Sequence, residues 1–241
     1  MKIIIAPAKV MKTKYVKIEQ TKLLFPKKTK QLLNYLEKYT INELHENMKI
    51  SFKMAETVYN YYHNDYNFTP AIYCYQGTVL KQLNLNSYQN EEFDYLDKYF
   101  NIMSAYYGVL KYNTGITPYR LDMIMKFDLD LYDFWQKDIN KYFKDEDYLI
   151  SLASKEFIKM INHPNIINID FVEDKAGKLV RNSMYIKQAR GKMLDMMVKN
   201  KIILLEELKK ITFDDYYYDD NLSTNDNYVF IRDAKQHYKK I

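Results

Sequence analysis

Helix-type and strand-type segments interleave irregularly along this chain of 241 residues, and their order restricts the folds that it can adopt. Short runs rich in apolar and β-branched residues at 3–5, 166–172 and 228–231 predict strands. Between them, apolar side chains recur every three or four residues over 51–62 and 130–143, which predicts amphipathic helices. Because no regular strand–helix–strand rhythm links these segments, the sequence predicts an α+β fold whose mixed β-sheet is surrounded by helices.

Cap and turn residues predict the other elements. Ser51 is placed to cap the helix over 51–62, and residues 173–178 to form the tip of a hairpin. No stretch rich in Gly, Pro or Ser divides the chain, so we expect 1–241 to form one compact domain. The remaining predicted elements are a helix from about 27, a helix starting at Thr69-Pro70, a helix from Asn90, a strand over 148–153, a short helix after Ser154, the hairpin strands 166–172 and 179–186, and a helix over 188–200.

Several classes of site are excluded or disfavoured by composition. Five glycines cannot form a Gly-rich nucleotide loop and also supply the turns, and the common nucleotide, metalloprotease and serine hydrolase motifs are missing. The single cysteine, Cys74, permits no internal disulfide and lies among apolar residues, so we expect a buried thiol. The histidines are scattered, and we expect surface or helix-end positions and no metal or cofactor. They are His45, His63, His163 and His237.

The positive charge of this chain is concentrated in two stretches. The formal net charge is only +5, but residues 1–30 hold nine lysines against one glutamate. Residues 175–202 hold eight lysines and arginines against one aspartate. This pattern favours a polyanionic partner, although lysines that serve only solubility explain it equally well. No window approaches 18 apolar residues and the apolar N-terminal run is too short for a signal peptide, so we expect a cytoplasmic protein without membrane contact.

Lys9 is the first candidate site residue. It follows the predicted buried strand 3–5 through Pro7-Ala8, and the ends of strands in open sheets are where ligand sites form. The alternative is an ordinary surface lysine just beyond a strand.

Residues 103–123 form the second candidate segment. An apolar helix end is predicted to precede Gly108, and the basic residues Lys111 and Arg120 follow. A helix–turn–helix arrangement here would expose backbone N–H groups that suit a phosphate. Gly108 would supply a positive φ or a close approach of the backbone.

The third candidate segment, 185–193, carries Lys187, Arg190 and Lys192 beside Gly191. We predict a strand-to-helix junction here, where the helix N-terminus adds positive potential. Arg190 is therefore expected to face solvent.

These segments, in this order and spacing, resemble the YaaA family of bacterial peroxide-stress-resistance proteins over nearly the whole chain. The resemblance implies a single α+β domain with a helix–hairpin–helix element and a positively charged cleft. It also implies binding to double-stranded DNA and protection against iron-driven oxidative damage. The matching blocks are Pro7-Ala8-Lys9, Met48-Lys49-Ile50-Ser51, Phe68-Thr69-Pro70-Ala71, Tyr107-Gly108-Val109-Leu110, Pro118-Tyr119-Arg120-Leu121-Asp122-Met123, Leu131-Tyr132 with Phe134-Trp135, Leu152-Ala153-Ser154 with Glu156, Ala189-Arg190-Gly191, and Phe230 with Arg232.

The candidate residues and the resemblance together suggest two alternative functions. In the first, a monomer contacts the backbone of double-stranded DNA without sequence preference. Its candidate contacts are Lys9, Ser104, Gly108, Lys111, Arg120, Lys187, Arg190 and Lys192. In the second, the same cleft around Lys9 and Arg120 acts on a nucleotide or another anionic metabolite, with Ser104 or Ser154 as polar partner. A long open groove would favour DNA, whereas a closed pocket would favour a small substrate. Three tyrosines are expected to pack beneath the cleft rather than stack on bases. They are Tyr106, Tyr107 and Tyr119.

Overall fold

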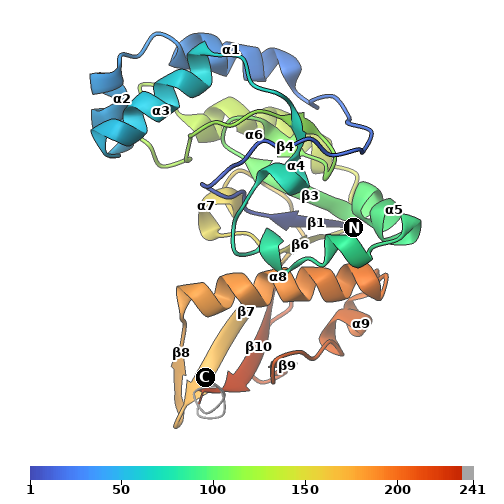
Figure 1. The fold of residues 1–241 in the computed structure, drawn as a ribbon. Coiled ribbons are helices and arrows are strands. Elements are labelled where there is room, and N and C mark those ends of the chain that lie inside the picture. The colour runs from blue at the N-terminus through green and yellow to red at the C-terminus, as the bar shows by residue number, and fades with distance from the viewer. Residues whose placement is uncertain (235–241) are drawn as a thin grey trace.

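A mixed sheet of eight strands runs through the molecule in the order β4-β3-β1-β6-β7-β10-β9, with β8 paired to β7 (Figure 1). The structure is a computed structural model and describes residues 1–234. The α+β class and the mixed sheet predicted from the sequence are confirmed. The strands of this sheet are β1 (Lys2–Ile5), β3 (Phe100–Ser104), β4 (Gly108–Leu110), β6 (Leu149–Ser151), β7 (Ile166–Lys175), β8 (Lys178–Val180), β9 (Tyr217–Tyr218) and β10 (Asn227–Asp233). A separate pair is formed by β2 (Thr69–Pro70) and β5 (Gly115–Ile116).

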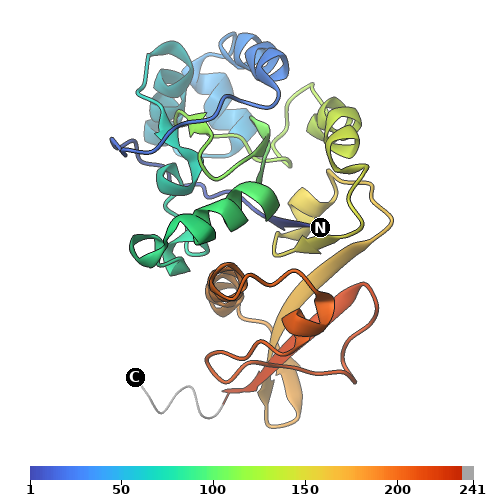
Figure 2. The ribbon, with the colours of Figure 1, turned by 90° about the vertical axis from the view of Figure 1, so that its right-hand side faces the viewer.

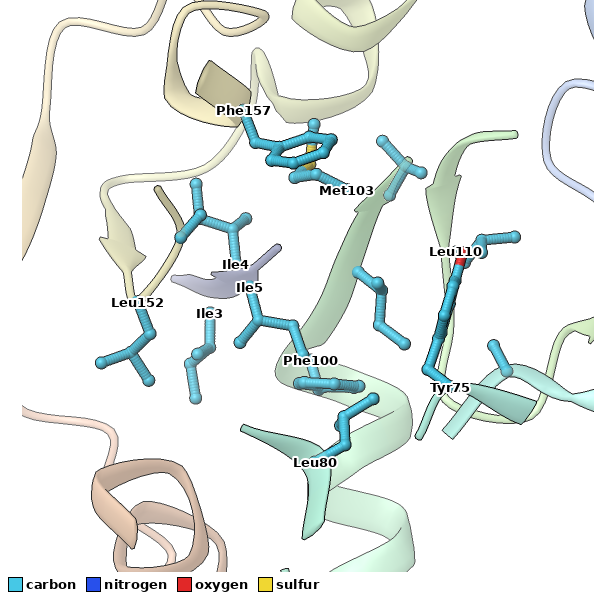
Figure 3. Close-up of a cluster of buried hydrophobic side chains, with 14 of the residues drawn as sticks. Ile3, Ile4, Ile5, Tyr75, Leu80, Phe100, Met103, Leu110, Leu152 and Phe157 are labelled. Carbon is cyan, nitrogen blue, oxygen red and sulfur yellow. The ribbon is translucent and has the colours of Figure 1, made fainter. Parts of the chain in front are cut away.

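The centre of the sheet is parallel and deeply buried. Strand β1 pairs in parallel with β3 and β6, so that Ile3 lies between Phe100 and Ile150. The three isoleucines of β1 have no solvent exposure, and Figure 3 shows them inside the cluster of buried side chains. Each buried aliphatic side chain of this size contributes about 1.5–3 kcal/mol to folding. The predicted strand at 3–5 is thus confirmed as a core strand.

Helices cover the sheet and follow the predicted amphipathic segments. Ser51 caps α3 by accepting a hydrogen bond from the Met54 amide (3.3 Å), as predicted. The first three helices gather at one end of the molecule (Figure 1). Within residues 1–234, none of the helices is long and apolar enough to cross a membrane. The helices are α1 (Pro26–Leu36), α2 (Ile41–Met48), α3 (Phe52–His63), α4 (Ala71–Cys74), α5 (Asn90–Tyr99), α6 (Leu131–Phe143), α7 (Lys155–Ile158), α8 (Ser183–Lys199) and α9 (Leu205–Lys209), with 3-10 turns η1 (Leu80–Gln82) and η2 (Leu85–Ser87).

The second half of the chain is built on the long strand β7. It pairs with β6 near its start and with β10 along most of its length, and Figure 2 shows it beside α8, which is seen nearly end-on. The predicted hairpin is confirmed, but β8 is shorter than expected. Residues 183–186 form the first turn of α8, because the Asn182 side chain accepts hydrogen bonds from the amides of Met184 and Tyr185.

The helix–hairpin–helix expected at 103–123 is not found there. Instead, β3 ends at Ser104 and turns tightly into the antiparallel β4, with Ser104 opposite Gly108. The apolar residues of β3 continue the helical spacing of α5, and such spacing cannot distinguish a buried strand from a helix. Gly108 has φ +77°, and a Cβ there would lie 2.7 Å from a ring carbon of Trp135. It is a structural turn glycine packed against an indole ring.

Candidate functional site

A pocket of about 520 Å³ opens beside the carboxyl ends of β1 and β6. Because these strands are parallel neighbours, their chains leave the sheet at the same edge, where ligand sites of open sheets form. The pocket is lined by residues 6–10 after β1, 76–80 before and within η1, 119–122 after β5, the start of α7 and the middle of α8. The residues after the first predicted strand, where the sequence predicts a candidate site, therefore line this pocket.

Backbone contacts fix the loops of the pocket. The segment after β1 is tied to the α4–η1 loop by a hydrogen bond from the Gln76 amide to the Val10 carbonyl (2.8 Å). Helix α8 comes close to the same loop at Gly191, where a Cβ would lie 2.1 Å from the Val79 carbonyl oxygen. Only glycine allows this approach, and it brings the neighbouring Arg190 to the pocket. On the far side, the Tyr62 hydroxyl donates to the Arg120 carbonyl.

Four predicted cations line the pocket together: Lys9, Arg120, Lys187 and Arg190. Lys9 Nζ lies 2.6 Å from Asp122 Oδ2, and Arg120 Nη2 lies 3.7 Å from the same oxygen. The Lys9 side chain is 61% exposed, so solvent and ligands reach it. The four cations come from three separated segments of the chain.

The two arginines carry an unusual feature. Among residues 1–234, the Nε atoms of Arg120 and Arg190 are buried and have no hydrogen-bond partner. Burial lowers the pKa of Arg190, while the charge of Asp170 raises it. A buried donor without an acceptor costs about 1–3 kcal/mol, and more when it is charged. Both arginine side chains line the pocket, where guanidinium groups suit an anion.

The positions of three predicted cations in α8 differ from the sequence prediction. Arg190 was expected at a solvent-facing helix start, but α8 begins at Ser183 and Arg190 lies in its interior, partly buried. Lys187 and Lys192 are likewise inside α8 rather than at a strand-to-helix junction. The field of a helix N-terminus therefore does not act on this cluster.

Two carboxylates, Asp122 and Glu156, also line the pocket. Glu156 Oε1 accepts a hydrogen bond from the Met123 amide (2.9 Å). Burial raises the pKa of Glu156, and the charge of Asp122 raises it further, whereas the Met123 amide and Lys9 act in the opposite direction. Both residues escaped the sequence analysis as site residues. The signal was present, since Glu156 follows the predicted strand 148–153 as Lys9 follows 3–5.

A hydrogen-bonded tyrosine cluster lies beneath the pocket. Tyr119 lines it, and the Tyr119 hydroxyl is 2.8 Å from Ser104 Oγ and 2.9 Å from the Tyr75 hydroxyl. Ser104 Oγ also accepts hydrogen bonds from the amides of Tyr106 and Tyr107. The expectation that the tyrosines pack beneath the site agrees with these contacts. Ser104 itself is fully buried, and its Oγ contact with the Tyr119 hydroxyl fixes the position of Tyr119.

The other predicted residues lie elsewhere. Gly108 is buried against Trp135. Lys111 Nζ pairs with Asp97 (3.1 Å), and Lys192 pairs with Asp214. Neither lysine lines the pocket. Cys74 is buried as predicted, and burial raises the pKa of its thiol to about 12. His237 lies outside the described residues.

Comparison with known proteins gives matches over almost the full chain. A family model described as peroxide stress protein YaaA matches residues 1–222. A UPF0246 protein of Fusobacterium nucleatum is 38% identical over 96% of this chain and 99% of the relative. UPF0246 proteins of Agathobacter rectalis and Rickettsia felis are 35% and 33% identical, over 96% and 97% of this chain and 99% and 100% of the relatives.

Proposed function

Since the chain belongs to the peroxide stress protein YaaA family, we propose that it acts in the peroxide stress response by binding double-stranded DNA through phosphate groups. The observation that carries the proposal is the convergence of four cations, Lys9, Arg120, Lys187 and Arg190, on one pocket. A phosphate oxygen accepts such donors, and guanidinium groups bind it in bidentate fashion. Contacts of this kind carry no sequence information.

The size of the pocket limits how DNA binds. A volume of about 520 Å³ is typical of small-ligand sites, so a duplex lies across the mouth and presents its phosphates to the four cations. Because Lys111 and Lys192 do not line the pocket, we count only these four cations, which neutralise about two to four phosphates. Protein cations displace the counterions of those phosphates. We infer that DNA-bound iron ions are among the displaced counterions, which connects DNA binding to less iron-driven damage.

Fluorescence anisotropy with labelled duplex, single-stranded and gapped DNA tests the proposal. For two to four neutralised phosphates, log K against log[salt] should fall with a slope of roughly −1.8 to −3.6 on duplex DNA. Lys187→Ala should reduce the magnitude of that slope by about 0.9, whereas Lys30→Ala, an exposed lysine of α1, should leave it unchanged. A flat salt response, or equal effects of the two variants, would refute binding at the pocket.

A second candidate function is favoured by the confinement of the pocket and its two carboxylates. In this alternative, the ligand is a free nucleotide or a similar phosphorylated metabolite held by Arg120 and Arg190. Isothermal titration with a panel of nucleoside monophosphates, diphosphates and inorganic phosphate separates the two functions. Saturable nucleotide binding that duplex DNA does not displace would favour the small ligand.

A further inference from the structure

We propose that the pocket hydrolyses the N-glycosidic bond of a nucleotide 5′-phosphate, with Glu156 as proton donor and Asp122 as the carboxylate that stabilises the sugar cation. The nucleotide is either free or part of a DNA strand. The inference rests on the proposed function, because the cations that bind the phosphate also anchor this substrate.

The two carboxylates occupy different electrostatic environments. Asp122 lies within 4 Å of two cations, Lys9 and Arg120. Glu156 has no ion-pair partner among residues 1–234, and burial and Asp122 both favour its protonated form. Two carboxyl groups in such different environments take the roles of proton donor and stabilising carboxylate in glycoside hydrolysis.

The backbone holds the pair in one place. Met123 follows Asp122 directly, and its amide donates to Glu156 Oε1. The peptide unit between Asp122 and Met123 therefore connects the two carboxyl-bearing residues along the pocket wall. The Met123 contact uses only Oε1, so we assign Oε2 as the oxygen that meets the ligand. The hydroxyl of Tyr132 in α6 donates to the Glu156 carbonyl (3.1 Å) and fixes the start of α7.

The remaining lining suits a nucleotide. The guanidinium groups of Arg120 and Arg190, which line the pocket, provide donors for the phosphate. The pocket has an apolar side formed by Leu152 and Phe157, which come before and after Glu156 in the chain. A nucleobase placed on that apolar side has its ring nitrogens near the proton donor, as the reaction requires. The volume of about 520 Å³ accommodates one nucleotide.

The proposed reaction is balanced with water as the only co-reactant. The bond from C1′ to the base nitrogen breaks, its electron pair stays with the base, and the Glu156 carboxyl transfers its proton to a ring nitrogen. The Asp122 carboxylate stabilises the positive charge that develops on the sugar. Water then forms a bond to C1′ and returns a proton to the Glu156 carboxylate. The products are the free base and a sugar 5-phosphate from a free nucleotide, or the free base and an abasic site from a DNA strand, without oxidation or reduction.

Base release is the test. The full chain is incubated with ribo- and deoxyribonucleoside 5′-monophosphates and, separately, with single-stranded and duplex DNA, and free base is measured by chromatography. Turnover of monophosphates alone identifies a free nucleotide as substrate, and turnover of DNA alone identifies a strand. The rate should fall as pH rises through the pKa of Glu156, because the acid is then deprotonated.

Variants separate this inference from the proposed function. Glu156→Gln retains Oε1 as acceptor for Met123 but cannot donate the proton, so turnover should fall at least about 100-fold while the affinity for inorganic phosphate and DNA stays the same. Glu91→Gln, at an exposed position of α5, is the matched control and should retain the wild-type rate. Wild-type turnover by Glu156→Gln, or a protein that binds the anions but releases no base in any arm, would overturn the inference and leave the proposed binding intact. Failure to bind any anion would overturn both.

Discussion

Arg190 offers a direct test of whether the pocket is built for an anion. Its Nε is buried without a partner, so the folded protein without ligand bears an unfavourable desolvation term of about 1–3 kcal/mol. Arg190→Met removes the charged group and retains most of the apolar stem. We therefore expect Arg190→Met to be more stable than the wild type by about 1–2 kcal/mol, which corresponds to a rise in Tm of roughly 2–8 °C for a chain of this size.

The same substitution should weaken anion binding. One phosphate contact is lost, so the affinity falls and the magnitude of the salt slope drops by about 0.9. Scanning calorimetry without and with inorganic phosphate or duplex DNA measures both effects, since the ligand raises the Tm of the wild type more than that of the variant. A drop in stability of more than about 1 kcal/mol with unchanged anion binding would make Arg190 a structural residue and refute the reasoning.

Three further predictions concern Lys9 in the pocket and two buried residues outside it, Gly108 and Cys74. Lys9→Arg should keep the affinity for DNA, because the charge beside Asp122 is retained, whereas Lys9→Ala should reduce the salt slope by about 0.9; equal losses in anisotropy would contradict this. Gly108→Val should lower the free energy of unfolding in urea by more than about 2 kcal/mol, because of the positive φ and the contact with Trp135, and leave the salt slope of the folded protein unchanged. Cys74, whose pKa burial raises to about 12, has about one thiolate in ten thousand at pH 8, so a thiol reagent should react only after unfolding; rapid reaction of the native protein would contradict its burial.

The sequence predicted the elements of the fold wherever pattern and cap agree. The run Ile3–Ile5 is β-branched and stopped by Pro7, and the helix over 52–63 has both a periodic face and the Ser51 cap. At 100–107 the apolar pattern alone does not decide the secondary structure, because fully buried apolar residues fit a strand or a helix equally well. Tertiary packing decides there: Ala105 accepts a hydrogen bond from the indole of Trp135, 30 residues further along the chain.

The site was predicted in part for a related reason. Position relative to a strand end identified Lys9 and is available from the sequence alone. The partners of each ion pair cannot be read from the sequence. It does not reveal that Lys111 pairs with Asp97 while Lys9 pairs with Asp122. A charge run therefore indicated a polyanion partner but could not separate cations of the pocket from cations paired on the surface. Glu156 was missed because an acid beside a serine after a strand also reads as ordinary helix-start chemistry.

The lowered pKa of Arg190 and the raised pKa of Glu156 have one physical origin. Burial disfavours the charged form of each group, and both groups line the same pocket. A chain selected only for stability would pair or solvate them, as it does with Glu173, whose carboxylate receives two hydrogen bonds from Arg232 in a still more buried setting. An anion that binds the folded protein at this pocket offsets such a cost, because it stabilises the folded state by mass action.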